Sequence, residues 1–164
     1  MKVIALPKQT RDSHLATHKV IISYTDVAAL GASATGTLAL FPINTAGAFT
    51  KTFPAGTVAR FAGLNLLTAF DFSDAGITSL TAEVGDGTDP NRLLTATELA
   101  VDGTEILYKV EGAVTQPYAY LAADTIDVLF TAANGGSPLL SECTSGEVEI
   151  YLHITDSNAL ERAR

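Results

Sequence analysis

The side chains best suited to chemistry in this chain are three histidines and a single cysteine. His14 and His18 have the i,i+4 spacing that suits zinc ligation from one face of a helix. No glutamate follows His14 as in the H-E-x-x-H arrangement, and no helical pattern surrounds the pair, so surface histidines are the favoured interpretation. His153 falls on the polar side of a strand pattern, where solvent or a partner would face it. Cys143 cannot form an internal disulfide or build a metal site alone, and we expect an inert thiol in a polar loop, with no structural duty.

Paired carboxylates offer a second kind of chemistry. Asp71 with Asp74, and Asp124 with Asp127, are close in sequence, and glycosidases need two carboxylates about 5–10 Å apart across a cleft. Any chain this acidic contains such pairs, so they do not indicate a glycosidase. The segment 85–89 is glycine-rich but lacks the Gly-Lys-Ser/Thr ending of a phosphate-binding loop. The sequence therefore predicts that the protein is not an enzyme.

The segment 86–91 resembles a calcium loop in its content of oxygen-bearing side chains. An EF-hand requires oxygen ligands at loop positions 1, 3 and 5, but Pro90 occupies position 5 when Asp86 is position 1. A tight turn is the favoured interpretation, with Asp89 capping a short helix that begins at Pro90 and runs to about residue 98. A calcium site of another kind near Asp86 and Asp89 is the alternative, and no cofactor is predicted.

Alternation with a period of two dominates the elements that would position these groups. The clearest strand covers residues 147–154, where Val148, Ile150, Leu152 and Ile154 share the face predicted to lie in the core. Further patterns predict strands over 19–25, 64–72, 79–84, 105–111 and 125–131, and weaker ones over 35–41, 57–62 and 118–121. Turn signals such as Asp102-Gly103 separate them, and a last helical turn is expected near 158–162. These strands predict an all-β fold: a two-sheet β-sandwich, jelly-roll-like, with at most one or two short helices.

Charge is distributed unevenly along the chain. Residues 1–20 hold four basic residues and one acid, whereas residues 71–161 hold 16 acids and two basic residues. This asymmetry predicts an extended basic N-terminal arm over 1–18 and a single β-sandwich domain over 19–164. We expect the arm to be mobile in the free chain and to order against a neighbouring subunit. The residues predicted to contact that partner are Lys2, Lys8, Arg11 and Lys19.

Composition excludes several classes of protein. With 10 basic and 18 acidic residues, the net charge of −8 argues against nucleic-acid binding, which needs a basic face. Residues 27–50 carry no charge, but glycines and a proline interrupt them, so they lack the apolar run of about 20 residues that a membrane span needs. They predict two strands with a loop that lies in the core or under a partner. The first residues lack the apolar stretch of a signal peptide, and the single cysteine does not indicate an oxidising compartment.

Two segments resemble a known family. Residues 84–94 and 123–154, together with the chain from Leu80 onward, resemble the head decoration (capsid cement) proteins of tailed bacteriophages. The resemblance implies a β-sandwich on the outer capsid surface that forms a homotrimer and binds across major capsid protein subunits. It also implies a virion location after synthesis in the host bacterial cytoplasm, and it carries over no catalytic residue.

Two other functions are the alternatives. One is another virion component, such as a tail or head-fibre protein, because the N-terminal half matches no family motif. The other is a carbohydrate-binding β-sandwich, which usually presents exposed aromatic side chains. The chain has no Trp and five Tyr, and Tyr118 with Tyr120 is the only close pair.

Overall fold

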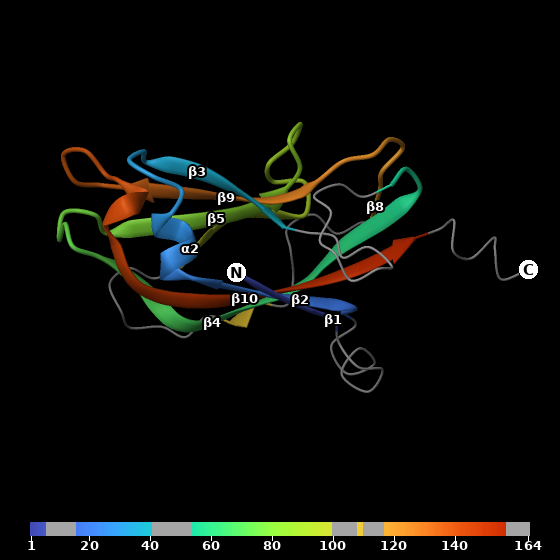
Figure 1. Ribbon diagram of the computed structural model, residues 1–164, viewed down its shortest axis with the longest axis horizontal. Helices are drawn as coiled ribbons and strands as arrows, with labels where there is room; N and C mark the ends of the chain where they lie inside the picture. Colours follow the sequence, from blue (N-terminus) through green and yellow to red (C-terminus); the bar gives the residue numbers. More distant parts are fainter. Residues whose placement is uncertain (6–15, 41–53, 100–107, 110–116, 157–164) are drawn as a thin grey trace, which may run out of the picture.

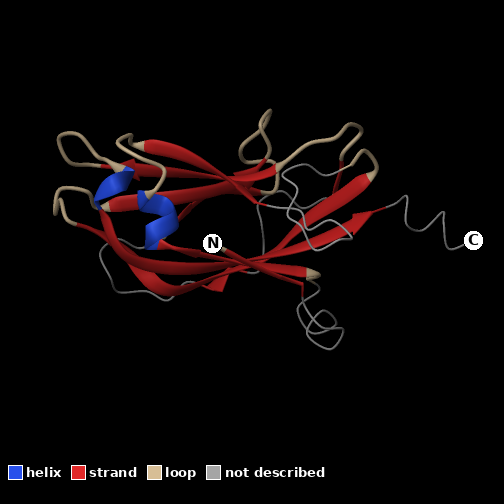
Figure 2. Ribbon diagram, in the orientation of Figure 1, coloured by secondary structure: helices blue, strands red, loops and turns tan. Residues whose placement is uncertain are grey.

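Two antiparallel sheets face each other in the computed structural model, which describes residues 1–5, 16–40, 54–99, 108–109 and 117–156 (Figures 1 and 2). The strands are β1 (Lys2–Ala5), β2 (His18–Ser23), β3 (Thr35–Leu40), β4 (Thr57–Phe72), β5 (Ser79–Gly85), β6 (Leu94–Glu98), β7 (Tyr108–Lys109), β8 (Tyr118–Ala119), β9 (Ile126–Ala133) and β10 (Cys143–Asp156). Two short helices complete the described elements: α2 (Tyr24–Ala28) and the 3₁₀ helix η1 (Leu140–Glu142).

The strands pair in a nested order. β2 pairs with β10, β3 with β9, β4 with β7, and β5 with β6. Successive nested pairs alternate between the two sheets. Sheet A has the strand order β1-β2-β10-β4-β7, and β8 also pairs with β4. Sheet B has the order β3-β9-β5-β6. Nested antiparallel pairs wrapped into two sheets make a jelly roll. The predicted all-β, two-sheet, jelly-roll-like fold is confirmed.

The core lies between the sheets, and the alternating strands supply it. In β10, Val148, Ile150 and Leu152 are fully buried, as predicted, while Ile154 is partly buried at the edge of the core. β5 and β9 contribute their predicted faces from the opposite sheet. The fully buried residues of these two strands are Leu80, Ala82, Val84, Ile126, Val128 and Phe130.

Residues 57–72 form one strand where the alternation predicts two. β4 pairs with β10 along most of its length, but the register shifts between Tyr151 and Leu152, which lie opposite Gly63 and Phe61. The extra residue of this bulge moves the alternation by one position, so Phe61 and Leu64 both face the core. That change of phase makes a single bulged strand look like two strands in the sequence.

The predicted strand 19–25 ends early, and a helix follows it. The carboxylate of Asp26 accepts hydrogen bonds from the backbone N–H and the hydroxyl of Ser23, at 2.9 and 2.7 Å. These bonds stabilise the first turn of α2, because a helix start leaves backbone N–H groups without partners. α2 packs against β10 and η1 and buries Val27, so it closes one side of the sandwich (Figure 2).

The predicted helix after Asp89 is wrong. Residues 90–93 form a turn, and β6 begins at Leu94. The backbone N–H of Leu93 donates to Val84 O at 2.8 Å, which returns the chain along β5 as a hairpin. Asp89 therefore belongs to a turn between two strands and does not cap a helix.

Both described parts of the predicted arm over 1–18 contact the β-sandwich. Lys2–Ala5 pairs with β2, with Lys2 opposite Ile21 and Ala5 opposite His18, and the amino group of Met1 forms an ion pair with Asp26. Ala16 is buried, and the Thr17 hydroxyl accepts from the N–H of Ile154 at 2.8 Å. Val3 and Ile4 are β-branched residues, which favour strand conformation.

Several predicted features lie outside the described residues. These are the segment 6–15 of the arm, positions 41–50 of the charge-free stretch, the Asp102-Gly103 turn, most of the predicted strand 105–111 and the last turn near 158–162.

The burial of Leu152 leads to a first prediction. Leu152→Ala should lower the free energy of unfolding by about 2–5 kcal/mol, because it removes buried methyl groups and leaves a cavity. Leu121, which is 92% exposed, provides the matched control, and Leu121→Ala should change stability by less than about 0.5 kcal/mol. Denaturant unfolding measures both changes, and equal effects of the two substitutions would contradict the assignment of the faces.

Cys143 lies in the core, so its predicted place in a polar loop is wrong. It follows η1 at the start of β10 and is 5% exposed, and burial raises the pKa of its thiol to about 11. Its polar neighbours in sequence, Glu142 and Thr144, belong to the end of η1 and the start of β10, whereas the Cys143 thiol belongs to the core cluster.

The buried thiol leads to a second prediction. Cys143 should resist alkylation by iodoacetamide in the native protein and react quickly in denaturant, because the thiolate is the reactive form. Cys143→Ser should lower the free energy of unfolding by about 1–3 kcal/mol, since it replaces a thiol of the core cluster by a more polar hydroxyl, for which the described structure offers the Ser145 carbonyl as an acceptor. Rapid alkylation under native conditions would show that the thiol is accessible and that the core assignment is wrong.

Candidate functional site

The four basic residues predicted to contact a partner are placed differently by the fold. Lys19 lies on β2, and its ammonium is 2.6 Å from the Glu149 carboxylate on β10. Lys2 lies on β1, where only the backbone is described, and Lys8 and Arg11 lie outside the described residues. The charge of Lys19 therefore stabilises the pairing of β2 with β10. The contact of all four basic residues with a partner stays a prediction.

Glu149 is the centre of a polar network on the outer face of sheet A. Its carboxylate accepts from the Lys19 ammonium, from the Tyr151 hydroxyl at 2.6 Å and from the Asn65 amide at 3.3 Å. Burial raises the pKa of Glu149, but the bonds from Lys19, Tyr151 and Asn65 outweigh it and hold the pKa below its usual value. The network joins three adjacent strands, β2, β10 and β4. The network therefore stabilises the pairing of these three strands.

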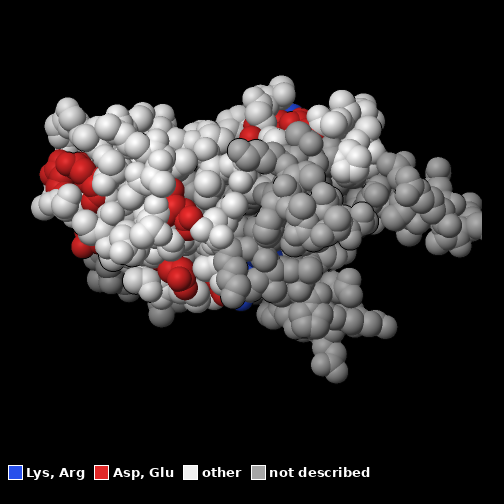
Figure 3. Space-filling view, in the orientation of Figure 1, with Lys and Arg blue, Asp and Glu red and all other residues white. Residues whose placement is uncertain are grey.

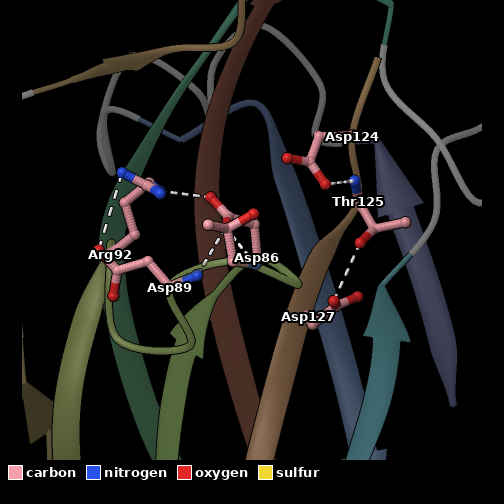
Figure 4. A network of polar contacts seen from close by, with 7 residues as sticks. Asp86, Asp89, Arg92, Asp124, Thr125 and Asp127 are labelled. Atoms are coloured by element: carbon pink, nitrogen blue, oxygen red, sulfur yellow. Dashed lines mark hydrogen bonds and ion pairs between the residues drawn. The ribbon is translucent and has the colours of Figure 1, made fainter. Parts of the chain in front are cut away.

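A second polar cluster surrounds the turn between β5 and β6 (Figure 4). Asp86 Oδ1 accepts from the backbone N–H groups of Thr88 and Asp89, both at 2.9 Å, and its other oxygen accepts from Arg92 Nε. Burial raises the pKa of Asp86. The hydrogen bonds from Arg92, Asp89 and Thr88 lower it by more, so the net pKa lies below its usual value. The carboxylate thus folds the turn and anchors the guanidinium.

Gly85 allows this turn to close. A Cβ at position 85 would lie 2.1 Å from the carbonyl oxygen of Asp89 and 2.4 Å from the carbonyl carbon of Pro90. Only glycine permits such a close approach of two backbone segments. The same approach lets the N–H of Asp86 donate to Asp89 O at 3.0 Å.

Arg92 connects this turn to the other sheet. Its guanidinium lies 4.0 Å from the centre of the Tyr118 ring on β8, and the ring of Tyr118 packs edge-on against Tyr120 with centroids 4.9 Å apart. A guanidinium over an aromatic face is attracted by the ring's negative face. β8 pairs with β4 of sheet A, whereas the turn belongs to sheet B, so Arg92 links the two sheets at one end of the sandwich.

Asp124, Thr125 and Asp127 lie beside the turn, at the start of β9 (Figure 4). Asp124 accepts from the N–H of Thr125 at 2.8 Å, and the Thr125 hydroxyl donates to Asp127 at 2.9 Å. Burial raises the pKa of Asp127, the Thr125 bond opposes this, and repulsion from Asp124 and Asp86 adds to the rise, so the net pKa is above its usual value. The second oxygen of Asp127 is buried and has no hydrogen-bond partner in the described part of the chain.

The arrangement at Asp86 differs from a calcium site. Its oxygens face N–H donors and a guanidinium, which occupy the positions that a cation would need. Across the described residues, no group of three or more His, Cys, Asp or Glu side chains is arranged to hold a metal ion. The cluster is therefore a folded turn with an internal ion pair.

The remaining predicted groups lie apart from these clusters. His18 begins a strand, so it cannot share a helix face with His14, which lies outside the described residues. Asp71, near the end of β4, accepts from the backbone N–H of Phe72, and Asp74, in the turn that follows, accepts from the N–H of Gly76, both at 2.8 Å. His153 is half-buried on the outer face of β10, with its Nε2 3.1 Å from the Thr155 hydroxyl.

Comparison of the chain with known protein families, with curated proteins and with solved structures finds no match in any of the three. In the part of the chain that the structure describes, no helix is long and apolar enough to cross a membrane.

The Asp86–Arg92 pair leads to a third prediction. Asp86→Asn should lower the free energy of unfolding at pH 7 by about 1.5–3 kcal/mol, because an amide cannot replace the charge-assisted bond to Arg92. The folded pKa of Asp86 lies below its unfolded value, so the stabilisation is present above the unfolded pKa and is lost as pH falls through the folded one. The difference between wild type and variant should therefore shrink with falling pH in denaturant unfolding. Asp71→Asn, at an exposed position near the end of β4 with no ion pair in the described residues, is the control and should have little effect on stability at pH 7. A pH-independent loss in Asp86→Asn would contradict the role given to the ion pair.

Proposed function

We propose that this protein decorates and stabilises the outer surface of a bacteriophage capsid by binding across major capsid protein subunits. It acts in the virion after synthesis in the host bacterial cytoplasm, and it works by contact without catalysing a reaction. The observation that carries the proposal is an exposed strip without charge on an acidic body. Residues 27–40 contain no charged side chain, yet Ala32, Ser33, Thr35 and Thr37 are exposed.

Figure 3 supports this choice of surface. The part of the visible face that lies over β3 carries no Lys, Arg, Asp or Glu, while acidic side chains gather at the end of the molecule beside it. In a chain of net charge −8, an uncharged exposed strip is suited to being covered, since interface centres are depleted of charge. The charges around it would set orientation and association rate.

The jelly-roll fold agrees with the proposal without deciding it. Jelly rolls occur in viral capsid proteins and in lectins, and a fold by itself does not determine a function. The segments that resemble capsid cement proteins are the 84–94 turn with the start of β6, and the strands β9 and β10 with their connection. They form the linked end of the sandwich and part of its centre.

The aromatic pair argues against the carbohydrate-binding alternative. A sugar platform needs an exposed ring, but Tyr120 is buried and the face of Tyr118 is covered by Arg92. Of the tyrosines whose side chains the structure describes, which leaves out Tyr108, Tyr24 on α2 is the exposed one, at 39%. One ring on a short helix does not make a stacking platform.

The fourth prediction tests the proposal in the particle. Purified virions should contain this chain in a fixed ratio to the major capsid protein, and the purified protein should co-sediment with capsids that lack it. The expected ratio is a simple fraction set by the capsid lattice. Presence only in the tail fraction would favour the alternative virion component, and absence from particles would overturn the proposal.

The same assay tests the predicted basic contacts. Lys8→Gln with Arg11→Gln should weaken binding to bare capsids and reduce its salt dependence, because charges that steer association are screened by salt. Substitution is preferable to deletion of the arm, since deletion would remove the paired strand β1. Lys51→Gln with Lys109→Gln removes the same charge elsewhere and should leave binding unchanged. Equal loss in both double variants would mean that net charge alone acts.

A further inference from the structure

The carboxylate of Glu149 contacts an amine and a carboxamide at the same time. The Lys19 ammonium lies 2.6 Å from its Oε1, and the Asn65 amide nitrogen donates to its Oε2 at 3.3 Å. An amine and a carboxamide are the two reactants of an amide exchange, in which the amine replaces the amide nitrogen and ammonia leaves. A carboxylate with one oxygen at the nucleophile and the other at the leaving group is placed to serve as both base and acid.

The register of sheet A holds these three side chains together on the outer face of the sheet. Glu149 on β10 lies directly opposite Asn65 of β4, and Lys19 of β2 lies opposite Tyr151, two positions further along β10. The long side chain of Lys19 reaches diagonally to Glu149, and the shorter side chain of Asn65 reaches it from the other side. Because three paired strands fix the reactants, they stay close for as long as the chain is folded, and such positioning strongly accelerates bond formation.

Burial makes a proton transfer within this network less costly than it would be in water. Glu149 is 8% exposed, the side chain of Lys19 is 21% exposed, and Asn65 is half-buried. Poor solvation disfavours the charged forms of both partners, and the neutral amine is the nucleophilic form of lysine. The ion pair is still the main form, because the bonds from Lys19, Tyr151 and Asn65 hold the pKa of Glu149 below its usual value. We therefore expect a slow reaction, which needs to occur only once in each chain.

The other ion pairs of the described residues each lack one of the reactants. Asp86 pairs with the guanidinium of Arg92, which stays protonated and is no nucleophile. Asp26 pairs with the amino group of Met1, but its further bonds come from Ser23, which offers no carboxamide.

Asn65 also differs from the other two asparagines of the described residues. Asn91 and Asn134 are exposed, and the amide of Asn134 donates to the Thr78 hydroxyl at 2.8 Å. Of the three, Asn65 is the one whose amide contacts a carboxylate. The combination of amine, carboxamide and buried carboxylate therefore occurs at one place in the described structure.

We propose that Lys19 and Asn65 join in an amide bond, with Glu149 as the catalytic residue, so that β2 and β4 become covalently linked across β10. Glu149 Oε1 takes a proton from the Lys19 ammonium, and the freed lone pair of Nζ attacks Cγ of Asn65. Glu149 Oε2 delivers the proton to Nδ2, the Cγ–Nδ2 bond breaks, and ammonia leaves. The attacking nitrogen gives up a second proton, which Glu149 passes to the ammonia. One ammonium and one carboxamide thus become one secondary amide and one ammonium ion, without oxidant or cofactor.

The bond would fix the two strands on either side of β10 to each other. It closes a loop from residue 19 to residue 65, and a crosslink that closes a long loop stabilises a fold mainly by restricting the unfolded chain. The chain has one cysteine, so a disulfide within the chain cannot supply such a link. The inference does not depend on the capsid proposal, because it concerns the covalent structure of a single chain.

The fifth prediction concerns the intact mass of the purified protein. The wild type should be lighter than its sequence by one ammonia, about 17 Da, whereas the variants below distinguish the roles of the residues. Lys19→Arg should show the full mass, since a guanidinium keeps the charge beside Glu149 but does not attack. Glu149→Gln should also show the full mass, because an amide cannot take up the proton. Glu98→Gln, which removes a carboxylate from β6, is the matched control and should keep the loss of ammonia.

Digestion with trypsin, which cleaves after Lys and Arg, locates the bond. Cleavage after Lys19 should fail, and a branched fragment should join residues 12–51 to residues 61–92. Circular dichroism verifies that each variant folds. Lys19→Arg keeps the ion pair, so it tests the bond even if Glu149→Gln does not fold.

Three results would overturn the proposal. The first is a wild type that keeps its full mass after prolonged incubation of the folded protein. The second is a loss of ammonia at another place, such as ring closure at Asn134 and Gly135, without the branched fragment. The third is a branched fragment of unchanged yield in folded Glu149→Gln, because Glu149 would then have no part in the reaction. Capsid binding is measured separately, so its failure leaves this result unaffected.

Discussion

The fold depends on strand β10, which pairs with a neighbouring strand along each edge and buries one face in the core. β10 lies between β2 and β4, and Val148, Ile150 and Leu152 fill the centre of the core. A slip of one residue would turn Glu149 and Tyr151 inward, so burial specifies the register strongly. Since β10 comes last among the described strands and β2 is near the start, this pairing closes the longest loop of the chain. Such non-local contacts form slowly, and the nested order of the other pairs brings the two strands together.

The sequence predicts an element well where the deciding interactions are local. In β5, β9 and β10 the alternation identifies both the strand and its buried face, because a half-buried strand has a period of two. The prediction fails where a side chain competes with the pattern over a few residues. Ser23 and Asp26 convert the end of a strand into α2, and Asp86 folds a turn where Asp89 and Pro90 look like a helix start.

The polar clusters could be predicted only in part. Asp86 and Arg92 are six residues apart in one turn, so a local sequence pattern can predict their pairing. Glu149 finds Lys19 at a separation of 130 residues and Asn65 at 84, and no local pattern shows which strands will be neighbours. The basic residues near Lys19 in sequence give no sign of the carboxylate that lies beside it in space. Once the jelly-roll order is known, both contacts follow from β10 lying between β2 and β4.

Charge in this protein has two roles. Buried or half-buried ion pairs at Glu149 and Asp86 hold strands and turns together, so they neutralise acids inside the body. The remaining acids give the molecule its negative charge, which keeps copies apart in most orientations. A jelly roll always leaves edge strands, because its sheets do not close into a barrel. β3 carries no charge, and acidic side chains lie on the surface beside it, so their repulsion limits the approaches of another acidic chain to this strand.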